Sequence, residues 1–147
     1  MQDGKSMTNY TLGFSINHDS NLILLVKKKF GPDFNIGKLN GLGGKLEKGE
    51  SSVQCMRREF REEAGLDIEE KDWYNFGDIF DGNNIVSLFK TDIFPDNIQE
   101  TNDVGEPLSV VSINDALYPE ETSLYAQNIP TIISHALTGY GYLEIII

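Results

Sequence analysis

Carboxylates gather between positions 50 and 63 of this 147-residue chain. Glu59, Glu62 and Glu63 are three and four positions apart, so they are neighbours on one face of a helix. Like charges so placed destabilise a helix by about 0.2–0.5 kcal/mol per pair, and a face selected only for stability would include lysines. Carboxylate oxygens are ligands that suit Mg²⁺ or Mn²⁺. We therefore predict a divalent-metal site here; the ordinary alternative is a solvated acidic face held by ion pairs.

A helix is predicted to present these carboxylates. Ser51 or Ser52 is a suitable N-cap, and Gly65 is a suitable stop after Ala64. At about 100° per residue, one apolar stripe forms at roughly 110° from the glutamates. Its members are Val53, Met56, Phe60 and Ala64. The stripe predicts that the helix packs on the core with its acidic face beside the core edge.

The carboxylates belong to a longer pattern with fixed spacing. Gly44 is followed after five residues by Glu50, and after seven more by residues 58–66, Arg-Glu-Phe-Arg-Glu-Glu-Ala-Gly-Leu. This resembles the Nudix box, G-x5-E-x7-R-E-U-x-E-E-x-G-U with U a bulky apolar residue, at every specified position. Phe60 is the loosest fit, because an aliphatic residue is commoner there. At about 7% usage per residue type, the seven fixed positions agree by chance roughly once in 10⁸ windows.

The resemblance implies a Nudix hydrolase, an α+β protein with a mixed β-sheet sandwiched between helices (α/β/α). It implies metal ligands at Glu59, Glu62 and Glu63, together with the carbonyl of Gly44. Arg58 is expected to orient the glutamates of the box, including Glu50. The general base is expected to be Glu62 or Glu59. Some relatives use an acid outside the box, which here would be Glu100 or Asp103.

The expected chemistry is hydrolysis of a phosphoanhydride bond. Mg²⁺, for which Mn²⁺ can substitute, neutralises phosphate oxygens, a carboxylate takes a proton from water, and the water attacks phosphorus in line.

Outside the box, the chain resembles the MutT-type 8-oxo-dGTP diphosphatases of the nucleotide-sanitation branch. The resemblance is carried by residues 10–12, 24–29, 40–45, 118–121 and 141–145. It implies that Asn40 and the adjacent Glu120 and Glu121 read a purine base. Two close carboxyls suit that role, because one pKa rises and that acid can donate while the other accepts. Thr11 and Lys27 are further candidate substrate contacts.

The candidate base pocket departs from the family pattern. Glu120 and Glu121 stand where the family has shorter aspartates, and Leu39 replaces a stacking tryptophan. Phe30 or Phe34, in a longer loop, could supply the lost stacking surface. Each candidate also has an ordinary explanation: acids at a helix N-terminus, an asparagine in a turn, a lysine at a solvated strand end.

The expected activity is that of a (d)NTP diphosphatase acting on an oxidised or ordinary purine nucleotide. An ADP-ribose or dinucleoside-polyphosphate pyrophosphatase is the enzymatic alternative. A non-catalytic nucleotide sensor is a third possibility, although a sensor has no need to retain Glu59, Glu62 and Glu63.

Composition limits the other possibilities. Residues 1–147 fit one globular domain, with 1–9 expected to be a flexible N-terminal extension. The net charge of −11 argues against binding a nucleic-acid polymer, and no apolar run is long enough for a membrane span. Cys55 is the only cysteine, which fits a reducing cytoplasm, and a buried thiol without catalytic role is expected. The sequence does not tell whether the protein is a monomer or a dimer.

Apolar runs and turn residues predict the remaining elements. These are a hairpin of Tyr10–Ile16 and Leu22–Lys28, a hairpin of Trp73–Phe80 and Ile85–Thr91, a strand at Leu108–Ile113, a helix at Thr122–Leu137 interrupted or restarted at Pro130, and a closing strand at Tyr140–Ile147.

Overall fold

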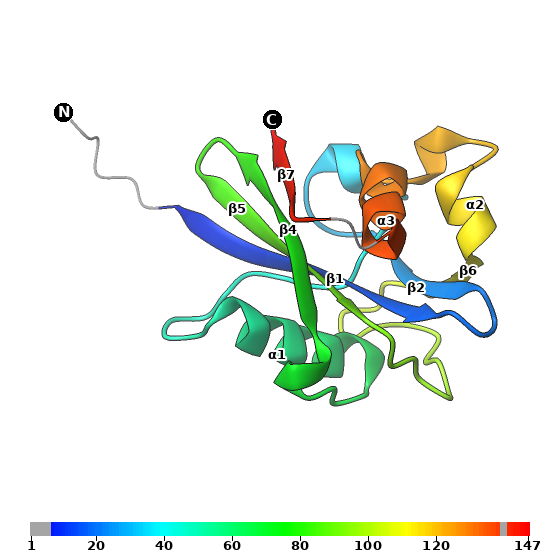
Figure 1. Cartoon of the computed structure of the whole chain (residues 1–147), viewed down its shortest axis with the longest axis horizontal. Coiled ribbons are helices and arrows are strands. Elements are labelled where there is room, and N and C mark those ends of the chain that lie inside the picture. Colours follow the sequence, from blue (N-terminus) through cyan, green and yellow to red (C-terminus); the bar gives the residue numbers. More distant parts are fainter. Residues whose placement is uncertain (1–6, 139–140) are drawn as a thin grey trace.

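The computed structural model describes residues 7–138 and 141–147 (Figure 1). Its strands are β1 (Thr8–Asn17), β2 (Leu22–Lys27), β3 (Leu39–Asn40), β4 (Tyr74–Asp81), β5 (Asn84–Thr91), β6 (Leu108–Ser112) and β7 (Leu143–Ile146). Its α-helices are α1 (Ser52–Ala64), α2 (Ile113–Leu117) and α3 (Ile129–Thr138). Single 3₁₀ turns are η1 (Asp33–Asn35), η2 (Glu70–Asp72) and η3 (Thr122–Leu124). None of the described helices is long and apolar enough to cross a membrane.

The strands form one mixed sheet of seven strands. The order is β3-β2-β1-β5-β4-β7, and β6 pairs with β2. β1 runs parallel to β5 and β4 runs parallel to β7, whereas the other pairs are antiparallel. Both predicted hairpins, β1–β2 and β4–β5, are confirmed.

Helices cover both faces of the sheet, α1 on one and α2 with α3 on the other (Figure 1). The alternation along β2 shows how the sequence builds two cores. Ile23 and Leu25 pack with α2 and α3, whereas Leu24 and Val26 pack with α1. A strand buried on both faces needs such a continuous apolar run. The predicted mixed sheet between helices is confirmed.

Local signals define α1 at both ends. The Ser51 side chain accepts a hydrogen bond from the Gln54 backbone N–H, and the Gln54 side chain accepts one from the Ser51 backbone N–H. This reciprocal capping box satisfies two free donors of the first turn. Gly65, at φ 78°, closes the helix in the left-handed conformation that favours glycine. Met56, Phe60 and Ala64 are buried as predicted.

The C-terminal helix is shorter than predicted. Only Ile129–Thr138 is α-helical, and residues 122–124 form a separate 3₁₀ turn. Asn128 has φ 68°, which interrupts any helix arriving from the N-terminal side. Pro130 then sits in the first turn, where its missing N–H costs no hydrogen bond.

Several predicted boundaries need correction. β1 begins at Thr8, and Thr8 and Asn9 pair with Asn84 and Ile85, so these two residues are not part of a flexible extension. Residues 1–6 and Tyr140 lie outside the described residues. The predicted strand 108–113 ends at Ser112, because that side chain accepts a hydrogen bond from the Asp115 N–H and caps α2.

Candidate active site

Arg58 connects the glutamates of α1 to the loop before the helix. Its Nε and Nη2 donate to the two carboxylate oxygens of Glu50 at 2.7 and 3.0 Å. Its Nη1 donates to Glu59 at 2.9 Å and lies 3.2 Å from a Glu62 oxygen. Nη2 also donates to the backbone carbonyl of Lys45 at 3.2 Å. The guanidinium thus orients Glu50 and joins it to the acidic face of the helix.

The charge of Glu50 is stabilised by this bidentate contact. The hydrogen bonds from Arg58, helped by one from the Glu47 backbone N–H, lower the pKa of Glu50 to about 2. Glu50 is therefore an anion at any physiological pH, and the pKa of Arg58 is raised in turn.

Glu59 lies against the glycine-rich loop. A Cβ on Gly44 would be 2.5 Å from Glu59 Oε1, so any other residue there would push the carboxylate away from this backbone. Burial raises the pKa of Glu59, against the opposing effect of Arg58. A partly desolvated carboxylate is a ligand that suits Mg²⁺.

Glu63 is turned toward the interior. It is 5% exposed, and its Oε2 accepts a hydrogen bond from the Gly43 backbone N–H at 2.9 Å. Its other oxygen lies 3.5 Å from the Asn102 amide nitrogen. Burial, together with the nearby charge of Glu59, raises the pKa of Glu63 to about 8. A cation beside Glu63 would favour the ionised form.

Glu62 is the most accessible of the three helix carboxylates, with 41% of its side chain exposed. We expected the carboxylates of Glu59, Glu62 and Glu63 to converge on one metal site, but in the structure they point in different directions. No group of three His, Cys, Asp or Glu side chains among residues 7–138 and 141–147 is arranged to hold an ion. The reason is visible in the contacts: Arg58 attracts Glu59 and Glu62, while the Gly43 N–H attracts Glu63.

The two acids predicted outside the box are placed differently. The charge of Asp103 contributes to the raised pKa of Glu59, after burial and the charge of Glu62. Glu100 contributes its backbone carbonyl to a hydrogen bond with Leu108 N–H, and its side chain is exposed, as is that of Asp103. A role for either acid stays a prediction.

Two buried polar residues, Asn102 and Glu106, were not predicted as part of the site. Glu106 accepts hydrogen bonds from Lys28 Nζ, from two backbone N–H groups and from Asn102. Burial opposes ionisation of Glu106, but these donors outweigh it and lower its pKa. Both residues lie in a polar loop with no periodic pattern, so nothing in the sequence marked them as buried.

Thr11 is buried on the side of the sheet that faces α1, because alternation along β1 turns its side chain toward the helix. Its hydroxyl lies 3.4 Å from Cys55 Sγ and 3.5 Å from the Gly44 carbonyl. The substrate contact expected of Thr11 stays a prediction. Cys55 is buried as expected, and burial raises its pKa to about 11, so the thiol stays neutral.

The remaining substrate candidates lie on the surface. Lys27 is exposed at the end of β2. Asn40 is half-buried, and its side-chain oxygen accepts a hydrogen bond from the Gly41 N–H, so part of its hydrogen-bonding capacity serves its own loop. Glu120 and Glu121 are exposed. They do not begin an α-helix, because α3 starts only at Ile129, which removes the helix-dipole explanation for these acids.

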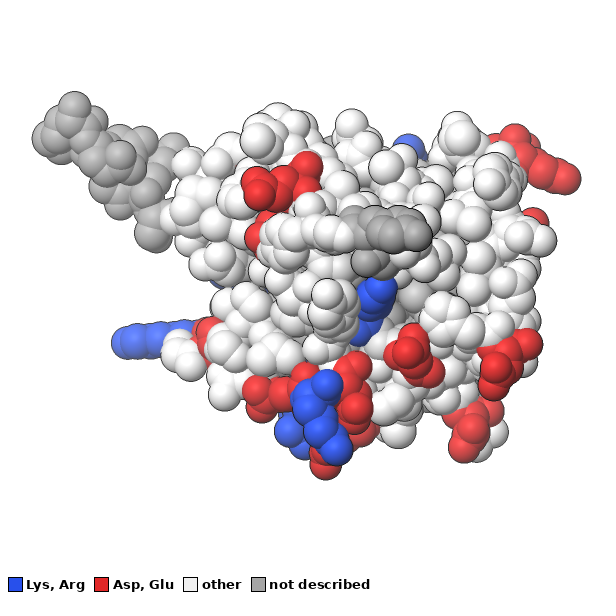
Figure 2. Space-filling model, viewed as in Figure 1, with Lys and Arg blue, Asp and Glu red and all other residues white. Residues whose placement is uncertain are grey.

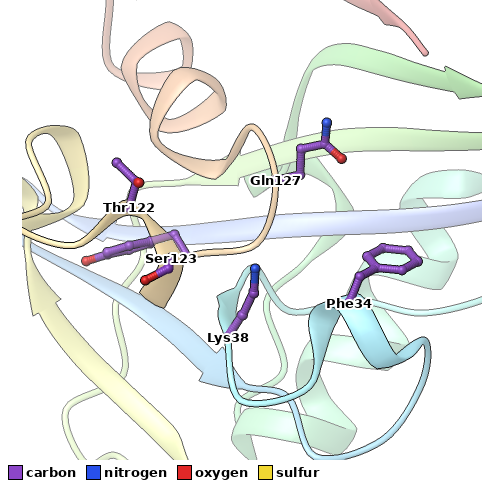
Figure 3. A pocket seen from close by; sticks show the side chains of 6 residues that line it. Phe34, Lys38, Thr122, Ser123 and Gln127 are labelled. Atoms are coloured by element: carbon purple, nitrogen blue, oxygen red, sulfur yellow. The ribbon is translucent and has the colours of Figure 1, made fainter.

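A pocket of about 500 Å³ lies beside β3. It is lined by Phe34, Lys38, Thr122, Ser123, Tyr125 and Gln127. Phe34 and Lys38 extend from the loop after β2 toward the segment that bears Thr122, Ser123 and Gln127 (Figure 3). The wall therefore combines aromatic rings, a lysine and neutral hydrogen-bonding groups. Phe34 lines this space, whereas Phe30 is not among its lining residues.

Charge is distributed unevenly over the surface. On the face shown in Figure 2, acidic and basic groups lie together at the lower edge, where α1 and the turn after it run in Figure 1. Arg57, on α1, pairs with Asp67, just after the helix, at 2.8 Å. Among the described residues, the face in Figure 2 shows no continuous basic track for a nucleic-acid backbone.

The fold, the box and the comparisons with known proteins agree. The NUDIX domain family matches residues 11–131. The structure resembles the mutator MutT protein of Bacillus halodurans (TM-score 0.72, 21% identity, 94% of this chain and 87% of that one). It also resembles the MutT protein of Methanosarcina mazei (TM-score 0.73, 17% identity, 95% and 99%).

A curated relative matches part of the sequence. The oxidized purine nucleoside triphosphate hydrolase of Danio rerio is 49% identical over 47 residues, which are 32% of this chain and 29% of that relative. Since the family match covers most of the chain, the protein belongs to the Nudix family and is a Nudix hydrolase.

Proposed function

We propose that the protein is a Mg²⁺-dependent nucleoside triphosphate diphosphatase that converts an oxidised purine nucleotide such as 8-oxo-dGTP to the monophosphate and pyrophosphate. The observation that carries the proposal is the Arg58-centred cluster, in which Glu50, Glu59 and Glu62 meet one guanidinium beside Gly44. The choice of substrate is supported by the partial match to the Danio rerio enzyme.

The metal would be held by Glu59, Glu62 and Glu63 with the Gly44 carbonyl, and Asp103 is the candidate acid from outside the box. The donor set is all oxygen, and the missing side chain at Gly44 leaves room for Glu59 beside the backbone. When bound, Mg²⁺ neutralises phosphate charge and orients the reacting groups. Mn²⁺ is expected to substitute, because it takes the same ligands.

Within the chain, Glu62 is the proposed general base. Its carboxylate is accessible to water, with 41% of the side chain exposed, whereas Glu59 is only 17% exposed and its contact with Arg58 is shorter, 2.9 Å against 3.2 Å. Glu62 takes the proton as the water oxygen attacks one of the two phosphorus atoms of the α–β anhydride. The bond from that phosphorus to the bridging oxygen breaks, and the products are the monophosphate and pyrophosphate. Arg58 and Glu50 keep the helix acids oriented during this step.

The nucleoside would occupy the pocket next to β3. Asn40, Lys27 and the pair Glu120 and Glu121 border the segments that line this pocket, and Phe34 offers a ring for stacking. The Asn40 amide NH₂ and the exposed glutamates would meet the polar edge of a purine.

A nucleotide panel tests the proposal. Pyrophosphate and phosphate release should be measured with 8-oxo-dGTP, dGTP, dATP, dCTP, ADP-ribose and diadenosine tetraphosphate in millimolar Mg²⁺. We expect the highest kcat/KM for an oxidised purine triphosphate, with pyrophosphate as product. Turnover of ADP-ribose or the dinucleotide without turnover of triphosphates would instead support the alternative pyrophosphatase activity, and binding without turnover would support a sensor.

A further inference from the structure

We propose that Asn102 and Glu106 are positioning residues that hold Glu63 and the turn bearing Asp103 against α1. The inference rests on the metal site of the proposed function. It assigns a role to two residues outside the Nudix box that themselves need not touch metal or substrate.

Glu106 is buried, and each of its two carboxylate oxygens accepts two hydrogen bonds. The side chain is 1% exposed. Its Oε2 accepts the backbone N–H groups of Lys29 and Phe30 at 2.9 and 3.2 Å. Its Oε1 accepts Lys28 Nζ at 3.1 Å and Asn102 Nδ2 at 3.0 Å. A carboxylate with four such partners is fixed in place, and it fixes the chain segments that supply them.

Asn102 closes the turn that carries Asp103. Its Oδ1 accepts the backbone N–H groups of Val104 and Glu106 at 3.2 and 2.8 Å. Its backbone N–H donates to the Glu106 carbonyl at 2.8 Å. The conformation of residues 102–106 is therefore determined by Asn102 and Glu106 together, and with it the position of Asp103 in the turn.

The same amide group of Asn102 faces the catalytic helix. Nδ2 lies 3.5 Å from Glu63 Oε1, while the Gly43 N–H holds Glu63 Oε2 from the other side at 2.9 Å. Glu63 is thus oriented by groups from two different loops. Partners of this kind orient metal-binding carboxylates, and their loss typically weakens metal binding about 10- to 100-fold.

Glu106 also connects the metal end of the site with the pocket. The turn at residues 28–30 leads into the loop with Phe34 and Lys38, which line the pocket. Loss of the Glu106 carboxylate should therefore disturb both metal binding and nucleotide binding, whereas loss of the Asn102 side chain should act mainly on the metal.

The test measures Mn²⁺ binding to the protein without nucleotide, by electron paramagnetic resonance, beside steady-state kinetics. For Asn102→Ala we expect a Kd for Mn²⁺ raised about 10- to 100-fold, with kcat lowered and the nucleotide KM at saturating metal nearly unchanged. For Glu106→Gln we expect weaker Mn²⁺ binding together with a raised KM, because an amide replaces two acceptor oxygens by one.

Ser112→Ala is the matched control, since it removes another side chain that accepts a backbone N–H, at the start of α2. It should lower Tm while Mn²⁺ affinity and kcat stay at the wild-type values. Should Asn102→Ala fail to fold, Lys28→Met replaces it, because that ammonium is partly exposed and supplies only one of the four bonds to Glu106. A smaller loss of Mn²⁺ affinity is expected there.

The outcomes separate the two proposals. A wild-type protein that binds no Mn²⁺ refutes the proposed metal site, and the inference with it. A wild-type protein that binds Mn²⁺, with Asn102→Ala or Lys28→Met binding it equally well and only Tm lowered, refutes the positioning role alone.

Discussion

Arg58 pairs with four carboxylates, those of Glu47, Glu50, Glu59 and Glu62, and supplies a positive charge among them. Of the two helix acids that pair with Arg58, Glu62 is the more exposed, with 41% of its side chain accessible against 17% for Glu59. Exposed ion pairs contribute only about 0–1 kcal/mol each, so a divalent cation can displace Glu62 from Arg58 at little cost. The pairs with Glu50 and Glu59 are better enclosed, and the one with Glu50 is bidentate.

The first prediction concerns Glu62→Gln. The change preserves size and helix propensity but removes the proton acceptor, so kcat should fall by at least about 10²-fold while Tm stays close to wild type. Steady-state kinetics and a thermal melt check both parts. Asp67→Asn, which removes a surface carboxylate paired with Arg57, is the control and should keep full activity. A near-normal rate for Glu62→Gln would move the base to Glu59 or Asp103.

A second prediction follows from the low pKa of Glu50. Its pKa is about 2 in the folded chain against 4.5 without partners, so the folded state binds this proton less readily. The resulting stabilisation is fully present above about pH 4.5 and is lost as the pH falls through 2. Urea unfolding in chelator, from pH 6 to pH 2, should show the stability gap between wild type and Glu50→Gln shrinking over this interval. A gap independent of pH would contradict the Arg58–Glu50 pair.

A third prediction separates the roles open to Glu120 and Glu121. If they read a purine edge, Glu120→Ala or Glu121→Ala should raise KM and reduce base preference, since an unpaired polar group costs about 1–3 kcal/mol. Both acids are exposed and begin no α-helix, so stability should change by less than about 0.5 kcal/mol. Kinetics with 8-oxo-dGTP, dGTP and dCTP check this, with Glu69→Ala as an exposed control. Unchanged base preference in both variants would remove this support for purine reading.

At the scale of elements, α1 carries the glutamates of the site on one face and packs its apolar face into the core. Phe60 is fully buried, one position from Glu59, and its ring packs edge-on against Trp73 with centroids 5.2 Å apart. Packing of this ring fixes the rotation of the helix about its axis, and that rotation decides where the glutamates point.

Phe60→Ala should therefore destabilise the fold by about 3–5 kcal/mol, and Phe60→Leu, the type of residue commoner in the family, by less. Chemical denaturation of both variants measures these losses. An unchanged unfolding midpoint for Phe60→Ala would contradict its place in the core.

The elements that the sequence predicted are those with local signals. The cap at Ser51, the stop at Gly65 and the apolar stripe defined α1, and the turn at residues 81–84 defined a hairpin. The start of α3 was missed because Asn128 adopts a left-handed conformation that its residue type permits but does not require.

The candidate site was predicted in its residues but not in its side-chain geometry. Helical spacing placed Glu63 on the same face as Glu59 and Glu62, yet spacing says nothing of the Gly43 N–H that draws Glu63 inward. The role of Glu106 depends on donors 76–78 positions away in the chain. Contacts of that range arise from tertiary packing and leave no mark on a local pattern.

At the scale of the whole molecule, the net charge of −11 repels a polyphosphate unless bound cations lie between the two sets of negative charges. We predict no turnover in excess chelator and recovery with millimolar Mg²⁺ or Mn²⁺. Tm should also rise with added metal, because ligands that bind only the folded state stabilise it. Phosphate release and thermal melts across a metal titration check this. Full turnover in excess chelator would refute the metal-dependent mechanism.

The parallel pair β1–β5 has a kinetic consequence. Thr8 pairs with Asn84, 76 positions later, and the register continues to Ser15 and Thr91. The middle of the sheet can therefore form only after α1 and β4 have been synthesised, and closing so long a loop precedes any gain from the contacts. During synthesis, β1 can pair with β2 as soon as the hairpin has formed, but its other edge stays unpaired until β5 has been made. Refolding should accordingly be slow for a chain of this length, and the edge of β1 is exposed to aggregation until β5 pairs with it.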